Sequence, residues 1–179
     1  MIKESDNELM YQVHGGQLDS LGLLYDRYQS QLFGFFTGMT QDRELSADLV
    51  QNVFYRILKY RSQFRGGSFK IWMFHIARNV LNDQYKRKYK TVSSSLDDFK
   101  DQVKDEKYAD DDLHHREDVY QLNKALAALP DDKREILLLS KYQDKNYKEI
   151  AEILGTTEGN VKVKVFRALN DLRSLYHQV

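Results

Sequence analysis

Apolar residues recur at steps of three and four along most of the chain, which is the spacing of one helix face. The first half carries three such runs, which predict helices from about residue 18 to 36, from Asp42 to Tyr60 and from Ser68 to Lys88. The sequence Arg65-Gly66-Gly67-Ser68 breaks the pattern before the third run, and Ser68 can cap the helix that follows. Nothing in this half alternates like a strand. The pattern predicts a bundle of three or four helices.

The pattern changes at residues 91–118, where serines and acidic residues replace the aliphatic ones. A polar stretch of this length is uncommon inside one compact domain, so it predicts a linker between two domains. Helical spacing resumes after the linker and is interrupted by Pro130. We therefore predict an all-α protein of two small helical domains, residues 1–90 and 119–179, joined by an acidic linker at residues 91–118.

Two consecutive helices joined by a tight turn are predicted near the C-terminus. The first runs from the capping residue Asn146 to Gly155, a residue that can adopt the left-handed conformation that ends a helix. The second begins at Thr156-Thr157, and its predicted buried face consists of Val161, Val165, Ala168, Leu169 and Leu172. The opposite face carries Gly159, Lys162, Val163, Phe166, Arg167 and Asn170. This is the helix-turn-helix arrangement, with an ordinary αα-hairpin as the alternative.

The exposed face of that second helix carries side chains suited to duplex DNA. In a major groove, Val163 or Phe166 can contact a thymine methyl group while Lys or Arg reaches guanine edges or phosphates. The same two apolar residues could instead pack on a neighbouring domain or a protein partner. If the two domains pack on each other through Phe166, the free protein would be partly self-inhibited.

The net charge of the chain is zero, from 27 Lys and Arg against 27 Asp and Glu, which by itself argues against a nucleic-acid partner. The charges are, however, segregated. Residues 56–90 carry ten Lys and Arg against Asp83 alone, and residues 162–179 have a net charge of +3, while residues 1–55 and 91–120 are acidic. Because the field at a surface depends on local charge, each basic block can act as an electrostatic footprint for nucleic acid.

The first basic block also mixes aromatic residues with its cations, over the segment from Phe64 to Asn79. This mixture suits single-stranded nucleic acid, because aromatic rings stack on bases and cations follow phosphates. Helical rotation places Phe69, Trp72 and Ile76 on the apolar face. The same rotation predicts an exposed set that could contact nucleic acid: Phe74, His75, Arg78, Asn79 and Asp83.

Composition excludes several other classes of protein. The chain has no Cys, which excludes disulfide frameworks, thiolate metal sites and cysteine chemistry. The five His residues are scattered, no phosphate-binding glycine loop follows a strand, and no carboxylate pair accompanies a nucleophile. We therefore expect neither an enzyme nor a metal or other cofactor. No apolar run approaches the roughly 18 residues that span a bilayer and no secretory signal is present, so we expect a cytoplasmic protein without membrane insertion.

Two motifs together resemble a known family. The sequence Asp48-Leu49-Val50-Gln51-Asn52-Val53-Phe54, followed by the segment from Phe64 to Asn79, resembles region 2 of the extracytoplasmic-function sigma factors of bacterial RNA polymerase. Leu129-Pro130, the segment from Tyr147 to Gly155 and the segment from Gly159 to Ala168 resemble region 4. The motifs stand in the family order and cover nearly all of the chain except the linker.

The resemblance implies a transcription initiation factor that directs core RNA polymerase to specific promoters and promotes DNA melting. Residues 1–90 would bind core polymerase and the melted minus-ten element, and residues 119–179 would read the minus-thirty-five element. Carried over by position, the polymerase-binding residues are Asp48, Gln51 and Phe54. The minus-ten residues are Arg65, Ser68, Phe74, His75, Arg78, Asn79 and Asp83. The minus-thirty-five residues are Lys162, Val163, Lys164, Phe166 and Arg167.

The sequence departs from the family pattern at three of these positions. Val163 stands where Ser is frequent and Lys164 where Arg is frequent, so the resemblance does not imply a base preference at the upstream element. His75 replaces a frequent Arg, which would weaken a phosphate contact or make it depend on pH. An anti-sigma factor is a further partner that the resemblance implies. The alternative is a stand-alone helix-turn-helix regulator, which would leave the basic aromatic segment at residues 64–89 without a role.

Overall fold

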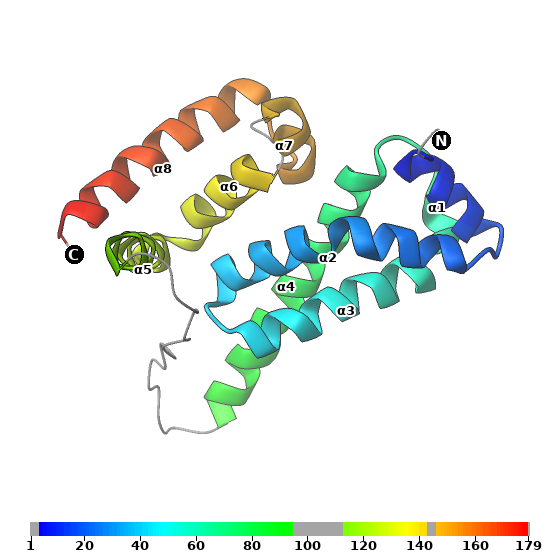
Figure 1. The fold of residues 1–179 in the computed structure, drawn as a ribbon, viewed down its shortest axis with the longest axis horizontal. Coiled ribbons are helices and arrows are strands. Elements are labelled where there is room, and N and C mark those ends of the chain that lie inside the picture. Colours follow the sequence, from blue (N-terminus) through cyan, green and yellow to red (C-terminus); the bar gives the residue numbers. More distant parts are fainter. Residues whose placement is uncertain (1–3, 95–112, 143–145, 179) are drawn as a thin grey trace.

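The structure, a computed structural model, describes residues 4–94, 113–142 and 146–178 of the chain (Figure 1). Every regular element in these ranges is helical. In chain order they are α1 (Asp6–His14), α2 (Asp19–Thr40), α3 (Arg43–Lys59), the 3-10 turn η1 (Arg61–Gln63), α4 (Phe69–Ser94), α5 (Leu113–Ala128), α6 (Asp131–Tyr142), α7 (Tyr147–Leu154) and α8 (Glu158–Gln178). The prediction of an all-α protein is confirmed. None of these helices is long and apolar enough to cross a membrane.

The first half contains the three helices that the apolar spacing predicts, α2, α3 and α4, together with a fourth, α1. Helix α1 begins with a capping box, in which Ser5 Oγ accepts a hydrogen bond from Glu8 N–H and the Glu8 carboxylate accepts one from Ser5 N–H. Its buried residues are Leu9, Met10 and Val13. A helix of 9 residues offers too few apolar positions for periodicity to reveal it, and its signal in the sequence is the cap.

Aromatic rings fill the centre of this half. Phe35 on α2 and Phe74 on α4 meet edge to face with their ring centroids 5.7 Å apart, and both are fully buried. Phe64 and Phe69, which flank the glycine-containing loop before α4, are buried as well. Burying a ring of this size stabilises a fold by about 2–3 kcal/mol, so these residues anchor both ends of the loop.

The second half is built from α5 to α8, with α8 packed on α5, α6 and α7. Helix α7 begins at Asn146, whose side chain accepts a hydrogen bond from Glu149 N–H, and ends at Gly155 with a φ of 65°. Both features are those expected from the sequence of this segment. Helix α8 buries Val161 and Val165 against its neighbours, as predicted.

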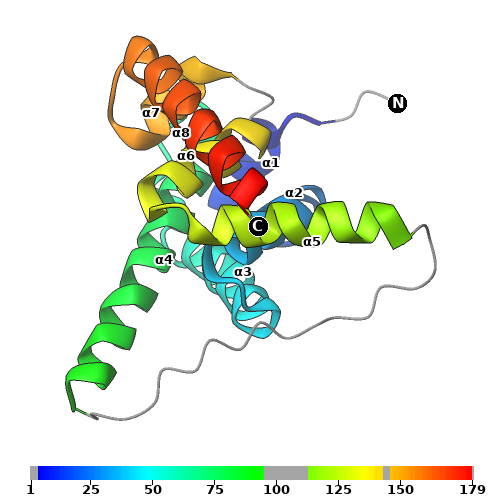
Figure 2. The same cartoon turned by 90° about the vertical axis from the view of Figure 1, so that its left-hand side faces the viewer.

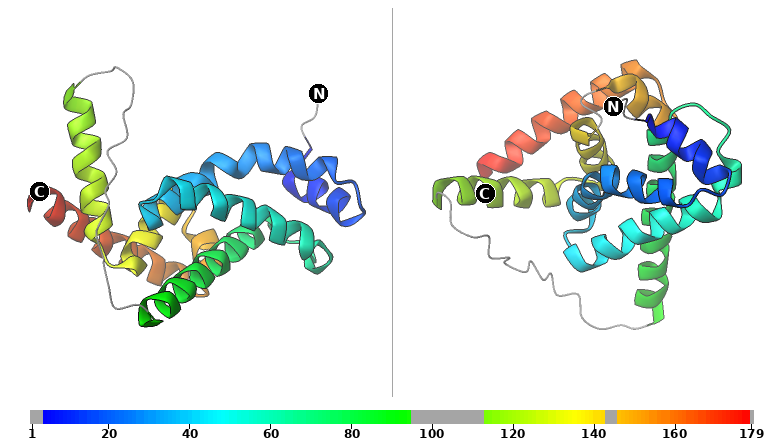
Figure 3. Two further views of the ribbon diagram at one scale, coloured as in Figure 1. Left: turned by 90° about the horizontal axis from the view of Figure 1, so that it is seen from below. Right: turned by 45° about the vertical axis from the view of Figure 1, so that its right-hand side comes forward.

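The two halves pack directly on each other. Helix α6 lies on α2 and α7 lies on α4, and Figures 2 and 3 show the second half covering one side of the first. At the contact between α2 and α6, a Cβ added at Gly38 would lie 2.6 Å from the Leu138 Cδ2, so any larger residue would require the Leu138 side chain to shift. Arg134 crosses the same contact and donates a hydrogen bond to the Met39 carbonyl at 2.9 Å. Phe166 is 66% exposed, so the two halves pack on each other without it, and the alternative in which they pack through Phe166 is not the one that the structure shows.

The ends of the predicted linker are helical where the structure describes them. Helix α4 continues to Ser94, and α5 begins at Leu113, so parts of residues 91–118 belong to helices. Residues 95–112, which hold most of the acidic side chains of the linker, lie outside the described residues. The boundaries 1–90, 91–118 and 119–179 remain a prediction.

Candidate nucleic-acid interface

The loop between η1 and α4 presents short polar groups at the surface. Gly66 and Gly67 have φ angles of 95° and 84°. Residues other than glycine rarely adopt this backbone conformation. Arg65 and Ser68 are exposed on either side of this pair. Ser68 Oγ accepts a hydrogen bond from Ile71 N–H at 3.4 Å, which confirms its predicted capping role. The loop therefore offers a guanidinium, a hydroxyl and backbone groups within a few residues.

Asn7 and Tyr11 on α1 contact this loop, and the sequence pattern did not reveal either of them. Asn7 donates a hydrogen bond to the Gly67 carbonyl and accepts one from Phe69 N–H at 2.9 Å. The Tyr11 ring lies edge to face on Phe64, with their centroids 5.5 Å apart. Both contacts join residues more than fifty positions apart, so no local spacing could have predicted them.

His75 and Asn79 lie on the exposed side of α4, as predicted. Phe74 does not, and its predicted exposure is wrong because the ring is fully buried in the core of the first half. The physical reason is that the Phe74 ring meets Phe35 of α2, so the buried arc of α4 is wider than the apolar stripe that packs on α3. Helical rotation alone could not anticipate the second covering helix.

Arg78 is held between the two halves of the molecule. Its Nε donates to Glu135 Oε1 on α6 at 2.7 Å, and its Nη1 donates to the Ile153 carbonyl on α7 at 3.0 Å. The neighbouring His75 has a pKa below the usual value, because partial burial disfavours its charged form and Arg78 repels it, against a weaker opposite effect of Glu152. In this arrangement the Arg78 guanidinium is already occupied by protein groups.

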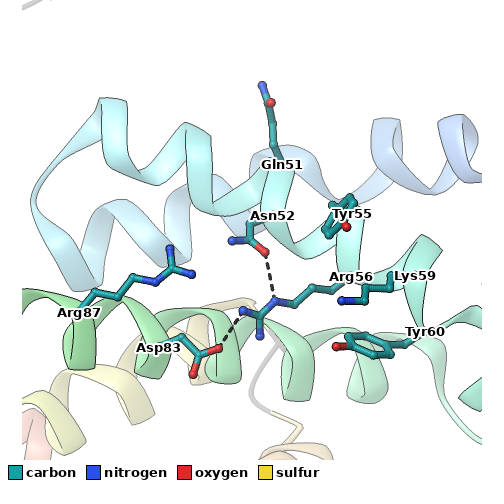
Figure 4. Close-up of a pocket in the computed structure, with 8 residues that line it drawn as sticks. All are labelled: Gln51, Asn52, Tyr55, Arg56, Lys59, Tyr60, Asp83 and Arg87. Atoms are coloured by element: carbon teal, nitrogen blue, oxygen red, sulfur yellow. Dashed lines mark hydrogen bonds and ion pairs between the residues drawn. The ribbon is translucent and has the colours of Figure 1, made fainter.

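Asp83 belongs to a polar hollow between α3 and α4 rather than to an open helix face (Figure 4). Arg56 donates to Asp83 Oδ2 at 2.8 Å and to Asn52 Oδ1 at 3.1 Å, so one guanidinium ties the two helices together. The hollow has a volume of about 580 Å³ and is lined by Gln51, Asn52, Tyr55, Arg56, Lys59, Tyr60, Asp83 and Arg87. Three of these residues are cations, so the hollow suits an anionic or carbonyl-rich ligand.

The outer face of α3 carries Asp48 and Gln51, both exposed as predicted. Phe54 is different, because it is only 6% exposed and its ring packs edge to face on Tyr25 with a centroid distance of 4.9 Å. Its prediction as a surface contact is therefore corrected to a role in the core that supports α3. The exposed aromatic on this face is Tyr55, one residue further along the helix.

The outer face of α8 matches its prediction closely. Lys162, Val163, Lys164, Phe166 and Arg167 are all exposed on α8. Lys162 forms an ion pair at 3.0 Å with Glu158 on the preceding turn. Leu169, predicted to be buried, is 48% exposed, and Leu172 is only partly buried. The last turns of α8 extend beyond α7 and lie beside α5 instead (Figure 1), where the Tyr176 hydroxyl donates to Asp118 at 3.3 Å.

These surfaces present cations, amides, hydroxyls and aromatic rings. Among the residues that the structure describes, no group of three His, Cys, Asp or Glu is placed to hold a metal ion. The exposed cations of the first half and of α8 lie on elements that also present Asn, Ser and aromatic groups. Such combinations recognise phosphates and base edges.

Two family descriptions match the chain, "Sigma-70 region 2" over residues 24–91 and "Sigma-70, region 4" over residues 120–172. The "ECF RNA polymerase sigma factor SigM" of Bacillus subtilis is 32% identical over 160 residues, which are 87% of this chain and 94% of that protein. The "ECF RNA polymerase sigma factor SigX" of the same organism is 30% identical over 160 residues, 87% of this chain and 82% of that protein.

Solved structures share the fold as well. A sigma factor RpoE from Bartonella quintana, in a co-crystal with the anti-sigma factor NepR, superposes with a TM-score of 0.73 and 26% identity over 86% of this chain and 94% of that one. CnrH, in complex with the cytosolic domain of CnrY, superposes with a TM-score of 0.74 over 98% of this chain and 99% of that one. Its sequence identity is 20%, so this second likeness concerns the fold alone.

Proposed function

The chain belongs to the extracytoplasmic-function sigma factors of the sigma-70 family, and from this premise we propose how its surfaces divide the work of transcription initiation. A sigma factor directs core RNA polymerase to specific promoters and promotes DNA melting. We assign polymerase binding and the melted minus-ten element to the first half, and the minus-thirty-five element to α7 and α8. The observation that carries the proposal is the presence of both family regions in one chain, each with an exposed set of cations and polar groups.

The polymerase-binding surface in this proposal is the outer face of α3. Asp48 and Gln51 project from it, and Tyr55 adds an exposed ring beside them. Gln51 lies at the edge of the hollow, and Figure 4 shows its side chain pointing away from the ion pair of Arg56 and Asp83. A polymerase helix lying along α3 could therefore contact Gln51 without disturbing the ion pair behind it. Phe54 contributes by holding α3 against Tyr25, and its side chain is not part of the contact surface.

The minus-ten surface combines the loop before α4 with the exposed side of α4. Arg65 and Ser68 supply a cation and a hydroxyl at the loop, while Asn79 supplies an amide that can bond a base edge and His75 an adjacent imidazole. Asp83 lies further along α4, where Arg56 holds its carboxylate in place. We assign Asp83 an orienting role, because a carboxylate in an ion pair is less available to bond a base.

The minus-thirty-five surface is the outer face of α8. Val163 and Phe166 are the apolar groups of this face, and Lys162, Lys164 and Arg167 are its cations. A helix of this kind can enter a major groove, where apolar side chains contact thymine methyl groups and cations reach guanine or phosphate. All five of these side chains are exposed in the described part of the chain, so they are accessible to DNA.

The packing of the two halves sets a condition on DNA binding by the first. Arg78 can reach a phosphate only after its hydrogen bonds to Glu135 and the Ile153 carbonyl are broken. We infer that the free chain is closed and that binding to core polymerase separates the halves. An anti-sigma factor such as the one seen with the Bartonella quintana relative would bind this chain too and keep it from polymerase. The protein would act in the cytoplasm, where polymerase and promoters are.

In vitro transcription with purified core polymerase tests the proposal. A sigma factor of this kind confers initiation at discrete start sites on genomic DNA, whereas core polymerase alone does not. A stand-alone regulator would bind duplex DNA yet give no promoter-specific transcript, and that result would overturn the proposal. The match to region 2 over residues 24–91 favours the sigma factor, because a regulator needs only its helix-turn-helix.

A further inference from the structure

Helix α1 lies beside the loop that precedes α4, although the two are far apart in the sequence. Figures 1 and 3 show α1 next to the segment that joins η1 to α4. Asn7 bonds the loop backbone twice, with Nδ2 donating to the Gly67 carbonyl and Oδ1 accepting from Phe69 N–H at 2.9 Å. Only one orientation of the amide satisfies both bonds, because the carbonyl can only accept and the N–H can only donate. The two bonded groups flank Ser68.

Tyr11, one turn further along α1, supports the loop from its other end. Its ring packs on the buried Phe64. Its hydroxyl oxygen lies so close to the loop that a Cβ added at Gly66 would be 2.7 Å from it. Tyr11 is 53% exposed, so it forms part of the surface around the loop. Tyr11 therefore supports the loop before Arg65, and Asn7 supports it after Arg65.

Helix α1 is itself held firmly enough to act as a support. Its N-terminus is closed by the Ser5 and Glu8 capping box, and its apolar residues are fully buried. Asp6 forms an ion pair with Arg27 on α2 at 2.7 Å and also accepts a hydrogen bond from the Tyr28 hydroxyl. Rotation or sliding of α1 would break several of these contacts at once.

We propose that Asn7 is a positioning residue for minus-ten recognition, and that Tyr11 assists it. This inference rests on the proposed function of the loop. Two consecutive glycines give the loop many accessible conformations, and recognition of one base requires that a single conformation be present beforehand. Asn7 selects that conformation through the backbone on both sides of Ser68. The base preference of the promoter is therefore set partly by a helix that does not touch the base.

The test compares Asn7→Ala with Asn123→Ala, which removes an exposed Asn from α5 and so controls for loss of a helical amide. The first measurement is hydrogen exchange of the loop amides in the free protein. The second is transcription by reconstituted holoenzyme from a pool of variants of one promoter, each changed at a single minus-ten position. This promoter is first identified by mapping the transcripts that the holoenzyme makes. The ratio between templates is unaffected by a uniform loss of active protein, so it separates positioning from general stability.

We expect the Phe69 amide to exchange faster in Asn7→Ala, because two hydrogen bonds are lost. The preference for one base at the most selective minus-ten position should fall about tenfold in the same variant. Binding of the variant to core polymerase should equal that of Asn123→Ala. Tyr11→Phe, which keeps the ring and the fold, should reduce the preference only slightly. An unchanged preference in Asn7→Ala would overturn the inference.

A parallel variant, Arg65→Ala, distinguishes failure of this inference from failure of the proposed function. If Arg65→Ala lowers the preference and Asn7→Ala does not, the loop reads the promoter without help from α1 and only the inference falls. If neither variant changes the preference, minus-ten reading by this loop is wrong as well. If Asn7→Ala speeds exchange at the Phe69 amide and both variants lose base preference, the positioning role of Asn7 and minus-ten reading by the loop are both supported.

Discussion

The candidate minus-ten surface and the candidate minus-thirty-five surface differ in what holds their side chains. On α8, Val163, Phe166 and Arg167 stand on one exposed helix face, and the helix itself supplies the geometry. In the first half, Arg78 is bonded to the second half of the chain and the loop before α4 is held by α1. A surface of the first kind can be recognised from helical spacing, whereas a surface of the second kind depends on contacts made after folding.

Two phenylalanines allow the largest test of this difference, because one was predicted exposed and is buried while the other is exposed as predicted. Phe74→Ala should destabilise the protein by roughly 3–5 kcal/mol, since it removes a ring from a packed core. Phe166→Ala should change stability by less than about 0.5 kcal/mol and weaken holoenzyme binding to duplex promoter DNA instead. Urea unfolding followed by circular dichroism and a promoter binding assay measure the two effects. Equal stabilities of the two variants would contradict the burial of Phe74.

A second pair of variants separates the two functions assigned to the first half. Asn79→Ala should slow open-complex formation roughly tenfold, because an amide that bonds a base edge contributes about 1–3 kcal/mol, and it should leave core polymerase binding intact. Asp48→Ala should weaken binding to core polymerase and leave the opening rate of assembled holoenzyme unchanged. Fluorescence anisotropy with labelled polymerase and permanganate footprinting report on the two steps. The reverse ordering would exchange the roles of α3 and α4.

The contact between the halves can be loosened at Glu135. Glu135→Gln removes the negative charge that pairs with Arg78 and should shift the free chain toward an extended state by about three- to tenfold. Small-angle scattering would then give a larger radius of gyration, and a single-stranded promoter fragment would bind more tightly without polymerase. The control is Glu158→Gln, which breaks an ion pair within α8 alone and should leave the radius unchanged. If both variants kept the wild-type radius, Arg78 would not be what holds the halves together.

The smallest effect concerns pH and His75. In the closed arrangement the pKa of His75 is lowered, chiefly by partial burial and then by Arg78, so this arrangement favours the neutral ring. If opening restores the usual pKa, the stability that His75 gives to the closed state is complete above about pH 6.5 and is lost as the pH falls below it. Scattering between about pH 7.5 and about pH 5.5 should show a modest opening that His75→Gln lacks. An identical pH response in that variant would assign the opening to other groups.

Much of the fold follows from residues that act within one turn of helix. Ser68, Asn146 and Gly155 are capping positions whose roles depend only on their neighbours, and the structure confirms all three. The outer face of α8 was also predictable, because one side of that helix packs on its own domain and the other does not. Leu169 departs from this prediction, because the structure leaves it 48% exposed.

The candidate site in the first half was predicted less completely, for a physical reason that Phe54 and Phe74 share. Both lie on helices that are covered along more than one side, so a residue beside the main apolar stripe is still buried. Asn7 was missed because the two backbone groups that it bonds lie 60 and 62 residues away in the sequence. The capping box of α1 was readable from Ser5 and Glu8, yet nothing in their spacing shows what the helix touches.

The sequence by itself determined that this protein is helical, that its charge is divided into blocks, and that it carries two sigma factor motifs in order. Local forces are sufficient for these properties, since helical periodicity, capping and charge act over a few residues. The tertiary structure decided which of the predicted contact residues are free to bind. Arg78, Asp83 and the glycine loop acquire their states from partners on other helices, and the free energy of such contacts depends on distances that exist only after the chain has folded.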